Sequence, residues 1–329
     1  MTTDRKCYIR SVAQVSCQEP LSESWMESAN ICTEDFVRSV EPAMRPFVSP
    51  IEARRMSKIL KRSVATGKTA LAKAGAECPD AIITGTGMGC IDNSEKFLID
   101  MARQGESCLK PTLFMQSTHN TISSLIAISL GCHGYNNTYS QGMISFESAL
   151  LDAWLIIKRG KSCNILVGAH DETTPLLAKV LRKAHPEFGF ISETSMSALV
   201  SGEPGAVEIE SVEIKSNATP EEIASTLDSD RDTVLMLGVA GIELNDSPYK
   251  AMLSRLDFEP MLLQYKNLFG FNFSVSAMGL YAAYAVLESG NVPESLLFGN
   301  TATPVETPKR ITIINYSPGT WSVIRLKHT

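Results

Sequence analysis

Two apolar segments, residues 145–160 and 274–290, limit the possible folds of this chain more than any other feature of the sequence. Each begins with serines, runs apolar for about three helical turns and ends in glycine. The second segment is apolar almost all round from Ala277 to Leu287, and a helix of that kind is buried on every side. One such helix in each half of the chain predicts a duplicated fold in which a helical layer lies between two sheets.

Strands and helices alternate through most of the sequence, which favours an α/β sheet with helices on its faces. The pattern changes near residues 196–215, where two strands joined by a Gly-Pro turn are expected to pair as an antiparallel hairpin. The expected halves are residues 1–214 and 215–329. Other expected elements are strands at 7–15, 80–85, 232–239 and within 310–327, and helices at 51–75, 93–105, 120–131, 219–227, 247–256 and 274–289.

The chain has 329 residues, of which 44% are apolar and 20% are charged, and this composition is typical of a folded globular protein. No apolar run reaches the roughly 18 residues of a membrane helix, and "MTTDRKCYIR" lacks the features of a signal peptide, so a cytoplasmic protein without a membrane span is expected. Net charge is −6. The basic run 54–62 spaces its charges around a helix, which predicts a solvated face rather than a nucleic-acid patch.

The cysteine and histidine content predicts neither a metal site nor a cofactor. None of the eight cysteines forms a C-x-x-C pair, and the five histidines include no H-E-x-x-H motif. Most cysteines lie in apolar runs, so they are expected to be buried free thiols in a reducing compartment.

The stretch from 134 to 172 predicts a strand, a sharp elbow, a buried helix and a second strand. Elbows that begin a buried helix hold the nucleophile in many acyl-transfer enzymes. Here Gly142 and Met143 occupy the elbow, and a thioether does not attack a carbonyl.

The segment "PTLFMQSTHNTISSLIAISLGCHGYN", followed by this elbow helix and "NILVGAHDE", resembles the β-ketoacyl synthase family. It is most similar to the divergent group called β-ketoacyl synthase N-terminal-like, whose members occur beside polyketide-type genes for aryl polyene and flexirubin pigments in bacteria. The resemblance covers residues from about 7 to 327 and is strongest between 80 and 172. It implies a thiolase-like fold, with duplicated α/β halves in five layers, αβαβα.

Condensing ketosynthases use one cysteine and two histidines, and the resemblance implies where these would stand. Met143 takes the place of the cysteine. "GVAGIELND" (238–246) is similar to the loop H-G-T-x-T-P-x-x-D, with Gly238 in place of the first histidine. "FSVSAMG" (273–279) matches the start of the second buried helix, with Phe273 in place of the second histidine. No catalytic residue is therefore predicted, because none of these side chains attacks a carbonyl or moves a proton.

The resemblance then implies a non-catalytic subunit. In type II systems a degenerate copy, the chain length factor, pairs with an active ketosynthase and shapes the tunnel for the growing chain. The strand at 135–140 is expected beside the dimer axis, and an active ketosynthase is the expected partner. An acidic acyl carrier protein is expected to contact this chain only indirectly, because this chain also has a negative net charge. Candidate tunnel or interface residues are Phe114, Met115, Gln116, Tyr135 and Tyr139.

Two alternatives stay open. The first is an acyltransferase or hydrolase on the same fold, with Ser140 as nucleophile and His119 or His133 as base, or with Cys90 as nucleophile. "TYSQG" is similar to the elbow G-x-S-x-G except that Thr138 replaces the first glycine. The second is a homodimeric binding or regulatory protein in which the pocket of the former active site holds a lipid.

Several titratable residues lie in or near the elements expected to be buried. Glu147 and Asp152 on the elbow helix each need a partner if they are buried, so both are expected to be structural hydrogen-bond anchors. His170, Asp171 and Glu172 close the following strand and are expected to line either a cleft or an interface.

Overall fold

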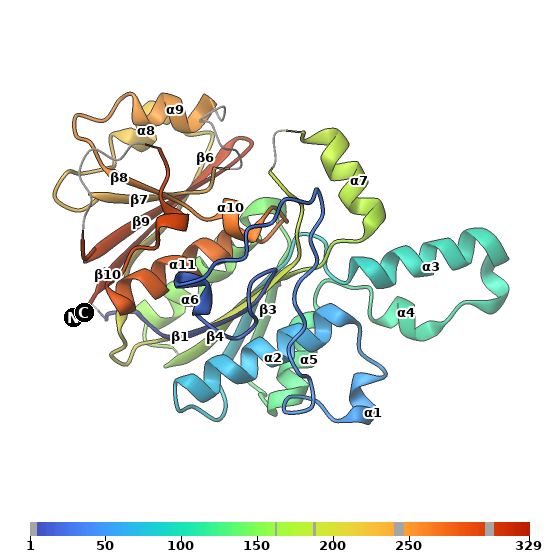
Figure 1. Ribbon diagram of the computed structural model, residues 1–329. Helices are drawn as coiled ribbons and strands as arrows, with labels where there is room; N and C mark the ends of the chain where they lie inside the picture. The colour runs from blue at the N-terminus through green and yellow to red at the C-terminus, as the bar shows by residue number, and fades with distance from the viewer. Residues whose placement is uncertain (1–4, 162, 187–188, 240–246, 300–305) are drawn as a thin grey trace.

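The computed structural model describes residues 5–161, 163–186, 189–239, 247–299 and 306–329, and its strands form a ten-stranded sheet (Figure 1). The first fifteen elements are β1 Tyr8–Val15, η1 Ser24–Met26, α1 Pro50–Ala53, α2 Lys58–Lys73, β2 Ala81–Gly85, α3 Ile91–Gln104, η2 Gly105–Cys108, α4 Pro111–Met115, α5 Thr121–Leu130, β3 Tyr135–Tyr139, η3 Gly142–Ile144, α6 Ser145–Lys158, β4 Asn164–Asp171, α7 Pro175–Ala184 and β5 Thr194–Ser201. The remaining elements are β6 Val207–Ser216, α8 Pro220–Ala224, β7 Val234–Leu237, α9 Ser247–Leu253, β8 Met261–Gln264, α10 Lys266–Phe269, α11 Ser276–Ser289, η4 Glu294–Leu296, β9 Arg310–Ser317 and β10 Thr320–His328.

The strand order repeats from one half of the chain to the other. The sheet runs β3-β2-β4-β5-β1 and then, in mirrored sequence, β6-β10-β9-β7-β8. In the first run β2 is parallel to β3 and β4, while β5 is antiparallel to β4 and β1. In the second run β7 is parallel to β8 and β9, while β10 is antiparallel to β9 and β6. The duplicated α/β architecture expected from the two buried helices is therefore confirmed.

Three hydrophobic cores among the described residues separate the layers. The central core contains α6, α11 and the strand faces turned toward them, and every residue of α11 from Ser276 to Leu287 is buried. A second core lies between α2, α5 and the outer face of the first run of strands. A third lies between α8, α9 and the outer face of the second run. The two runs of strands form two of the layers, and their alternation with the three groups of helices gives the five layers (Figure 1).

The two runs of strands meet through β1 and β6, which pair over only two positions, Tyr8 with Glu208 and Ile9 with Val207. The expected hairpin between 196 and 215 is wrong, because β1 lies between β5 and β6 in the sheet. A turn compatible with a hairpin does not make the two strands that it joins pair with each other. Here β1, from the start of the chain, pairs with both of them. The predicted boundary at 214/215 falls within β6, and we propose that the second half begins with this strand.

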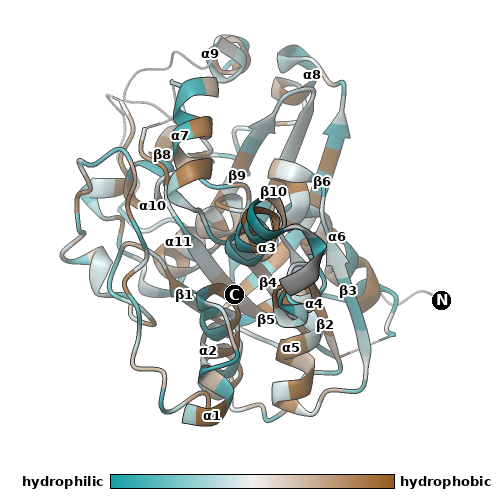
Figure 2. Cartoon of the chain, turned by 90° about the vertical axis from the view of Figure 1, so that its right-hand side faces the viewer, coloured by the Kyte–Doolittle hydropathy of each residue, from teal (hydrophilic) through white to brown (hydrophobic). Residues whose placement is uncertain are grey.

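Two features of the first half bear on function. Helices α3 and α4 project away from the body of the molecule (Figure 1), and the rings of Phe97 and Phe114 pack 5.5 Å apart within this projection. Strand β3 lies at an edge of the sheet (Figure 2) and pairs only with β2 among the described residues. In the described part of the chain, no helix has the length and apolar character needed to cross a bilayer.

Candidate functional site

The elbow before α6 has the predicted shape. Gly142 adopts φ +60°, a left-handed conformation that glycine tolerates, and η3 then leads into α6. The Ser145 hydroxyl accepts a hydrogen bond from the Gln141 N–H (2.8 Å) and donates one to the Gly142 carbonyl (2.7 Å), which fixes the turn. Met143 is half-buried and packs against the central core. The elbow is thus retained, with an apolar thioether at its tip.

The position of the first histidine has no space for a side chain. Gly238 follows β7 and is buried. A Cβ atom there would lie 2.1 Å from Asn315 Oδ1, 2.9 Å from Tyr265 Oη and 3.0 Å from Tyr249 Oη. Residues 240–246, which complete the loop compared with H-G-T-x-T-P-x-x-D, lie outside the described residues.

Phe273, at the position of the second histidine, is half-buried just before α11. Its ring lies 6.2 Å from that of Phe271. A Cβ atom on Gly87 would lie 2.2 Å from the Phe273 Cβ, so the glycine loop after β2 packs directly on this side chain. The absence of a side chain at Gly87 permits this approach.

Glu147 connects α6, which follows Met143, to α11, which follows Phe273, and to Asn315 beside Gly238. Its Oε2 accepts a hydrogen bond from Ser276 Oγ (3.0 Å), and its Oε1 accepts from Asn315 Nδ2 (2.9 Å) and Ser322 Oγ (3.1 Å). The carboxyl group is fully buried, and burial raises its pKa. Since Glu147 joins α6 to α11, β9 and β10, its predicted role as a structural anchor is confirmed.

Asp152, the second predicted anchor on α6, accepts a hydrogen bond from the Tyr135 hydroxyl at 3.1 Å. This bond ties the elbow helix to the edge strand β3. Tyr139, four residues further along the same face of β3, packs against the central core, and burial raises its pKa to about 12.

Asp171 organises the glycine loop that follows β2. Its carboxylate accepts hydrogen bonds from the Thr86 hydroxyl (2.9 Å), the Gly87 N–H (2.9 Å) and the Met88 N–H (2.9 Å). Burial raises the pKa of Asp171, and these donors act against that rise. The loop is therefore fixed from within the protein.

His170 and Glu172 are also buried, so the expectation that residues 170–172 line a cleft or an interface is wrong. Burial lowers the pKa of His170 to about 3, and the neutral ring places Nδ1 2.7 Å from Ser195 Oγ. Burial raises the pKa of Glu172 to about 7, while its Oε1 accepts a hydrogen bond from the Asp92 N–H at 3.1 Å. A strand end rich in polar residues suggests a functional site. Here His170 and Glu172 are instead enclosed inside the first half, in contact with Ser195 and Asp92.

The structure gives little support to the alternative nucleophiles. Ser140 is exposed, and among the described residues neither His119 nor His133 makes a hydrogen bond to it. Cys90 is fully buried, and burial raises its pKa to about 12, so it is held as a thiol. No group of three or more His, Cys, Asp or Glu side chains in the described part of the chain is placed to hold a metal ion.

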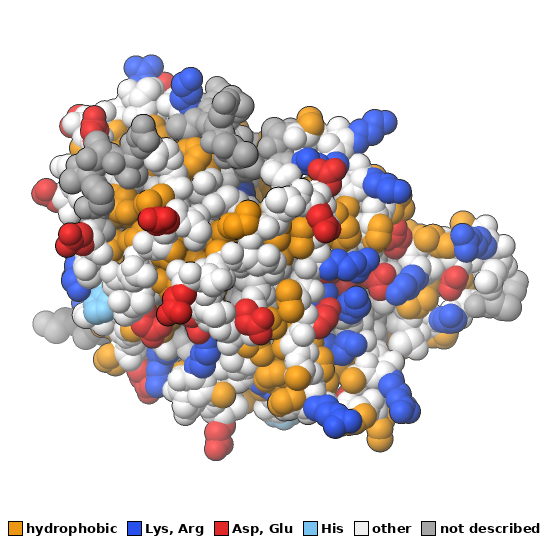
Figure 3. All heavy atoms as spheres, in the orientation of Figure 1, with side chains coloured by type: hydrophobic (Ala, Val, Ile, Leu, Met, Phe, Trp, Pro, Cys, Tyr) orange, Lys and Arg blue, Asp and Glu red, His pale blue; other side chains and the backbone are white. Residues whose placement is uncertain are grey.

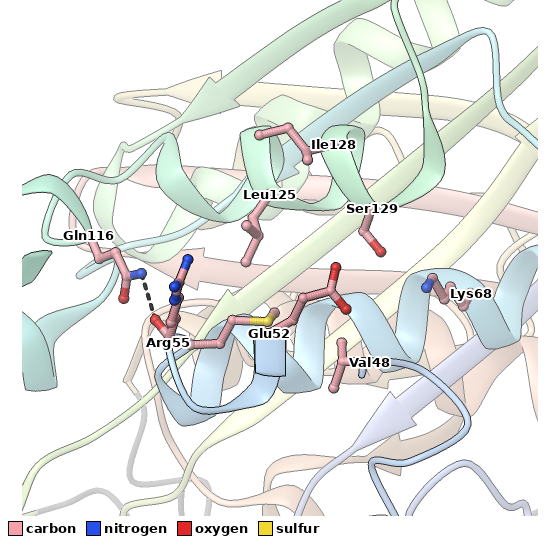
Figure 4. A pocket seen from close by; sticks show the side chains of 9 residues that line it. Val48, Glu52, Arg55, Lys68, Gln116, Leu125, Ile128 and Ser129 are labelled. Atoms are coloured by element: carbon pink, nitrogen blue, oxygen red, sulfur yellow. Dashed lines mark hydrogen bonds between the residues drawn. The ribbon is translucent and has the colours of Figure 1, made fainter. Parts of the chain in front are cut away.

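The tunnel and interface candidates lie in three places, which are the α3–α4 projection, strand β3 and a pocket that Gln116 lines. Phe114 and Met115 lie on the α3–α4 projection with 60% and 71% of their surface exposed, and Tyr135 on β3 is 49% exposed. Gln116 instead donates a hydrogen bond to the Arg55 carbonyl (2.7 Å) and lines a pocket of about 310 Å³ between α1, α2 and α5 (Figure 4).

Positive charge gathers beside this pocket, which the net charge of −6 did not indicate. Residues 37–68 hold eight Lys or Arg but only two Glu. Figure 3 shows Lys and Arg side chains crowded on the side of this face next to the α3–α4 projection. The exposed cations of the segment are Arg38, Arg45, Arg54, Arg55 and Lys58.

The family model described as "Beta-ketoacyl synthase, N-terminal domain" matches residues 24–234. The chain belongs to the β-ketoacyl synthase family. No curated protein matches its sequence. The thiolase-like fold inferred from the elbow segment is confirmed by the solved structures that resemble this chain.

Two of these structures are ketosynthase and chain length factor pairs, and a third contains an acyl carrier protein. "The ishigamide ketosynthase/chain length factor" superposes with a TM-score of 0.84 at 14% identity, covering 99% of this chain and 100% of the other. A ketosynthase in complex with its chain length factor from Xenorhabdus doucetiae gives a TM-score of 0.78 at 15% identity, covering 99% and 98%. A type II polyketide synthase acyl carrier protein in complex with its ketosynthase gives 0.78 at 14%, covering 99% and 100%.

Within this family scaffold, the residues that fill the space at Gly238 were not found from the sequence. Tyr265 donates to Asn315 Oδ1 (3.2 Å), and Tyr249 Oη accepts from the Tyr316 N–H (2.7 Å), so both rings are anchored there. The available signal was Asn315 itself, an amide in the middle of the apolar strand "RITIINYS". A buried amide in such a strand needs partners.

Gly238→Ala is expected to destabilise the fold by about 2 kcal/mol, because the new methyl group meets an Asn315 side chain that hydrogen bonds hold in place. Thermal unfolding of the purified variant measures this. Gly142→Ala, at a position where a Cβ meets nothing within 4 Å but φ is positive, separates crowding from backbone strain. An unchanged melting temperature for Gly238→Ala would show that the site has space for a side chain.

Proposed function

We propose that this chain is a non-catalytic subunit of the chain length factor type, which pairs with an active β-ketoacyl-ACP synthase and shapes the tunnel for its growing acyl or polyene chain. The observation that carries the proposal is the set Met143, Gly238 and Phe273 on a retained scaffold. None of the three supplies a nucleophile or a proton carrier, and Gly238 is enclosed by side chains that exclude a histidine.

The surface of the first half supports a dimeric role. The outer side of β3 is unpaired in the described part of the chain, and an unpaired strand edge is a template for a strand of another chain. Helix α4 lies in the projection beyond the body of the molecule (Figure 1) and carries Phe114 and Met115, whose exposed apolar side chains would be available to a partner. The structural neighbours include ketosynthase and chain length factor pairs, which agrees with this mode of assembly.

An acidic acyl carrier protein is the second partner we propose. The sequence placed its contacts on the ketosynthase, but the exposed cations between Arg38 and Lys58 give an acidic surface a site on this chain as well. The product class we propose is that of bacterial polyketide-type or fatty-acid-type synthesis, including the aryl polyene and flexirubin pigments.

Native mass spectrometry on the tagged chain, purified from cells that also express its genomic neighbours, tests the proposal. The expected result is a one-to-one complex with a ketosynthase that has the intact cysteine and two histidines. A Met115→Trp variant of that complex is then expected to make shorter products, because added bulk at the tunnel reduces its length. Recovery of a homodimer alone, with or without bound lipid, would contradict the heterodimer and favour the lipid-binding alternative.

A further inference from the structure

Two thiols meet where the chain enters β2 and β3. Cys78 Sγ lies 3.5 Å from the carbonyl oxygen of Pro79, and Cys132 Sγ lies 3.3 Å from the same oxygen. Both thiols donate to one atom, and the Cys78 thiol also interacts directly with that of Cys132, so the two side chains are neighbours although they are far apart in the sequence.

The strand register explains this approach. β2 and β3 pair in parallel with Ala81 opposite Tyr135, and continuing the register back by three residues brings Cys78 opposite Cys132. A Cβ atom on Gly134 would lie 1.8 Å from the Asp80 carbonyl oxygen, so the two segments remain in contact before the strands begin. Neighbouring strands lie about 4.8 Å apart, which is within the roughly 4.4–6.8 Å between Cα atoms that a disulfide spans.

Reagents in solution can reach the pair. Most cysteines were expected to be buried, but among the seven that the structure describes only Cys7, Cys17 and Cys90 are, so that expectation is wrong for the others. Cys78 is exposed and Cys132 is half-buried. Partial burial raises the pKa of the Cys78 thiol, and the neighbouring Cys132 adds to this rise. Cys78 is therefore held as a thiol near neutral pH, and it reacts faster under mildly alkaline conditions.

We propose that Cys78 and Cys132 are a redox pair that forms a reversible disulfide with a low-molecular-weight disulfide, of the glutathione class, as oxidant. The thiolate of Cys78 attacks the oxidant, forms a mixed disulfide and releases one small thiolate, which takes up a proton. The thiolate of Cys132 then attacks the Cys78 sulfur, forms the internal disulfide and releases the second small thiolate. The protein loses two electrons and two protons, and the oxidant is reduced to two thiols.

This inference goes beyond the proposed function and does not depend on it. The link would close a loop of residues 79–131, which contains the α3–α4 projection, and it would end three residues before β3. A closed loop restricts the unfolded chain, and a covalent bond at this point holds the start of the edge strand against β2.

The test uses the full chain, reduced, freed of reductant and incubated with oxidised glutathione at pH 8. The non-reduced protein is digested with proteases that cut between Cys78 and Cys90 and between Cys108 and Cys132, and linked peptides are identified by mass spectrometry. The expected result is a Cys78–Cys132 link, a loss of two titratable thiols per chain, and a melting temperature higher by roughly 5 °C that returns to its starting value with reductant.

Matched variants decide the assignment. Cys78→Ser and Cys132→Ser are each expected to lose both the link and the thermal shift. Cys163→Ser is expected to keep both, although Cys163 is exposed and its N–H lies 2.9 Å from Asp80 Oδ2. A Cys78–Cys163 link, or glutathione attached separately to Cys78 and Cys132 without a link between them, would overturn the proposal.

Discussion

Asn136→Pro in β3 is expected to weaken binding of the proposed ketosynthase partner roughly 100-fold, because proline removes a backbone donor from the free side of the edge strand. The direction of that donor follows from the ladder. The Tyr139 carbonyl accepts a hydrogen bond from the Thr86 N–H (3.0 Å), so alternate residues from Tyr135 to Tyr139 direct their backbone groups toward β2. The backbone groups of Asn136 and Thr138 therefore point away from the sheet.

The measurement is the dissociation constant of the purified complex, taken with monomer stability as a reference. Asn136→Ala is the matched control, since it also loses the side-chain bond to the Ser123 carbonyl (3.1 Å) but keeps the backbone N–H. Proline is tolerated at an edge position whose N–H faces solvent, so the monomer is expected to fold. Equal affinities for the proline and alanine variants would show that the partner binds elsewhere.

Glu147→Ala is expected to destabilise the monomer by about 4 kcal/mol. The substitution leaves three buried donors, on Ser276, Asn315 and Ser322, without their acceptor and opens a cavity at the centre of the molecule. Because these donors belong to α11, β9 and β10, contact between the first and second halves is lost as well. Chemical denaturation of the purified variant measures the change.

Glu147→Gln is the control for this prediction. Gln keeps one carboxamide oxygen as acceptor, and its N–H₂ group can donate to a serine hydroxyl that rotates to accept. Since burial already raises the pKa of Glu147, replacing the acid with a neutral amide is expected to cost about 1 kcal/mol. Equal losses for the alanine and glutamine variants would show that negative charge, and not hydrogen bonding, is what the site requires.

The layered fold could be predicted because its strongest signal is local. The segments at 145–160 and 274–290 are apolar around most of their circumference, and only burial between two layers satisfies such helices. The pairing of β5 was not predictable in the same way. Its neighbours are β4 and β1, and β1 comes from the start of the chain, so no short-range pattern encodes the contact.

The candidate site could also be predicted only where its signal is local. Register along the elbow segment identified Met143 at the position of the cysteine, and matching of short motifs identified Gly238 and Phe273 at the positions of the two histidines. The enclosure of Gly238 depends on Tyr249, Tyr265 and Asn315, which come from three separate elements. The gathering of Lys and Arg on one face was hidden for a related reason, because a total charge averages over all faces of the molecule.

The edge of β3 also bears on the choice between like and unlike partners. Thr138 directs its backbone N–H outward, but the Asn137 side chain already accepts it at 3.0 Å. The outer side of the strand thus offers the Asn136 N–H as a donor, set against the two carbonyls of Asn136 and Thr138. Two copies of this chain would meet with the same shortage of donors, whereas a strand with its own N–H groups unoccupied would supply them. We therefore expect the edge to favour a complementary subunit over a second copy of this chain.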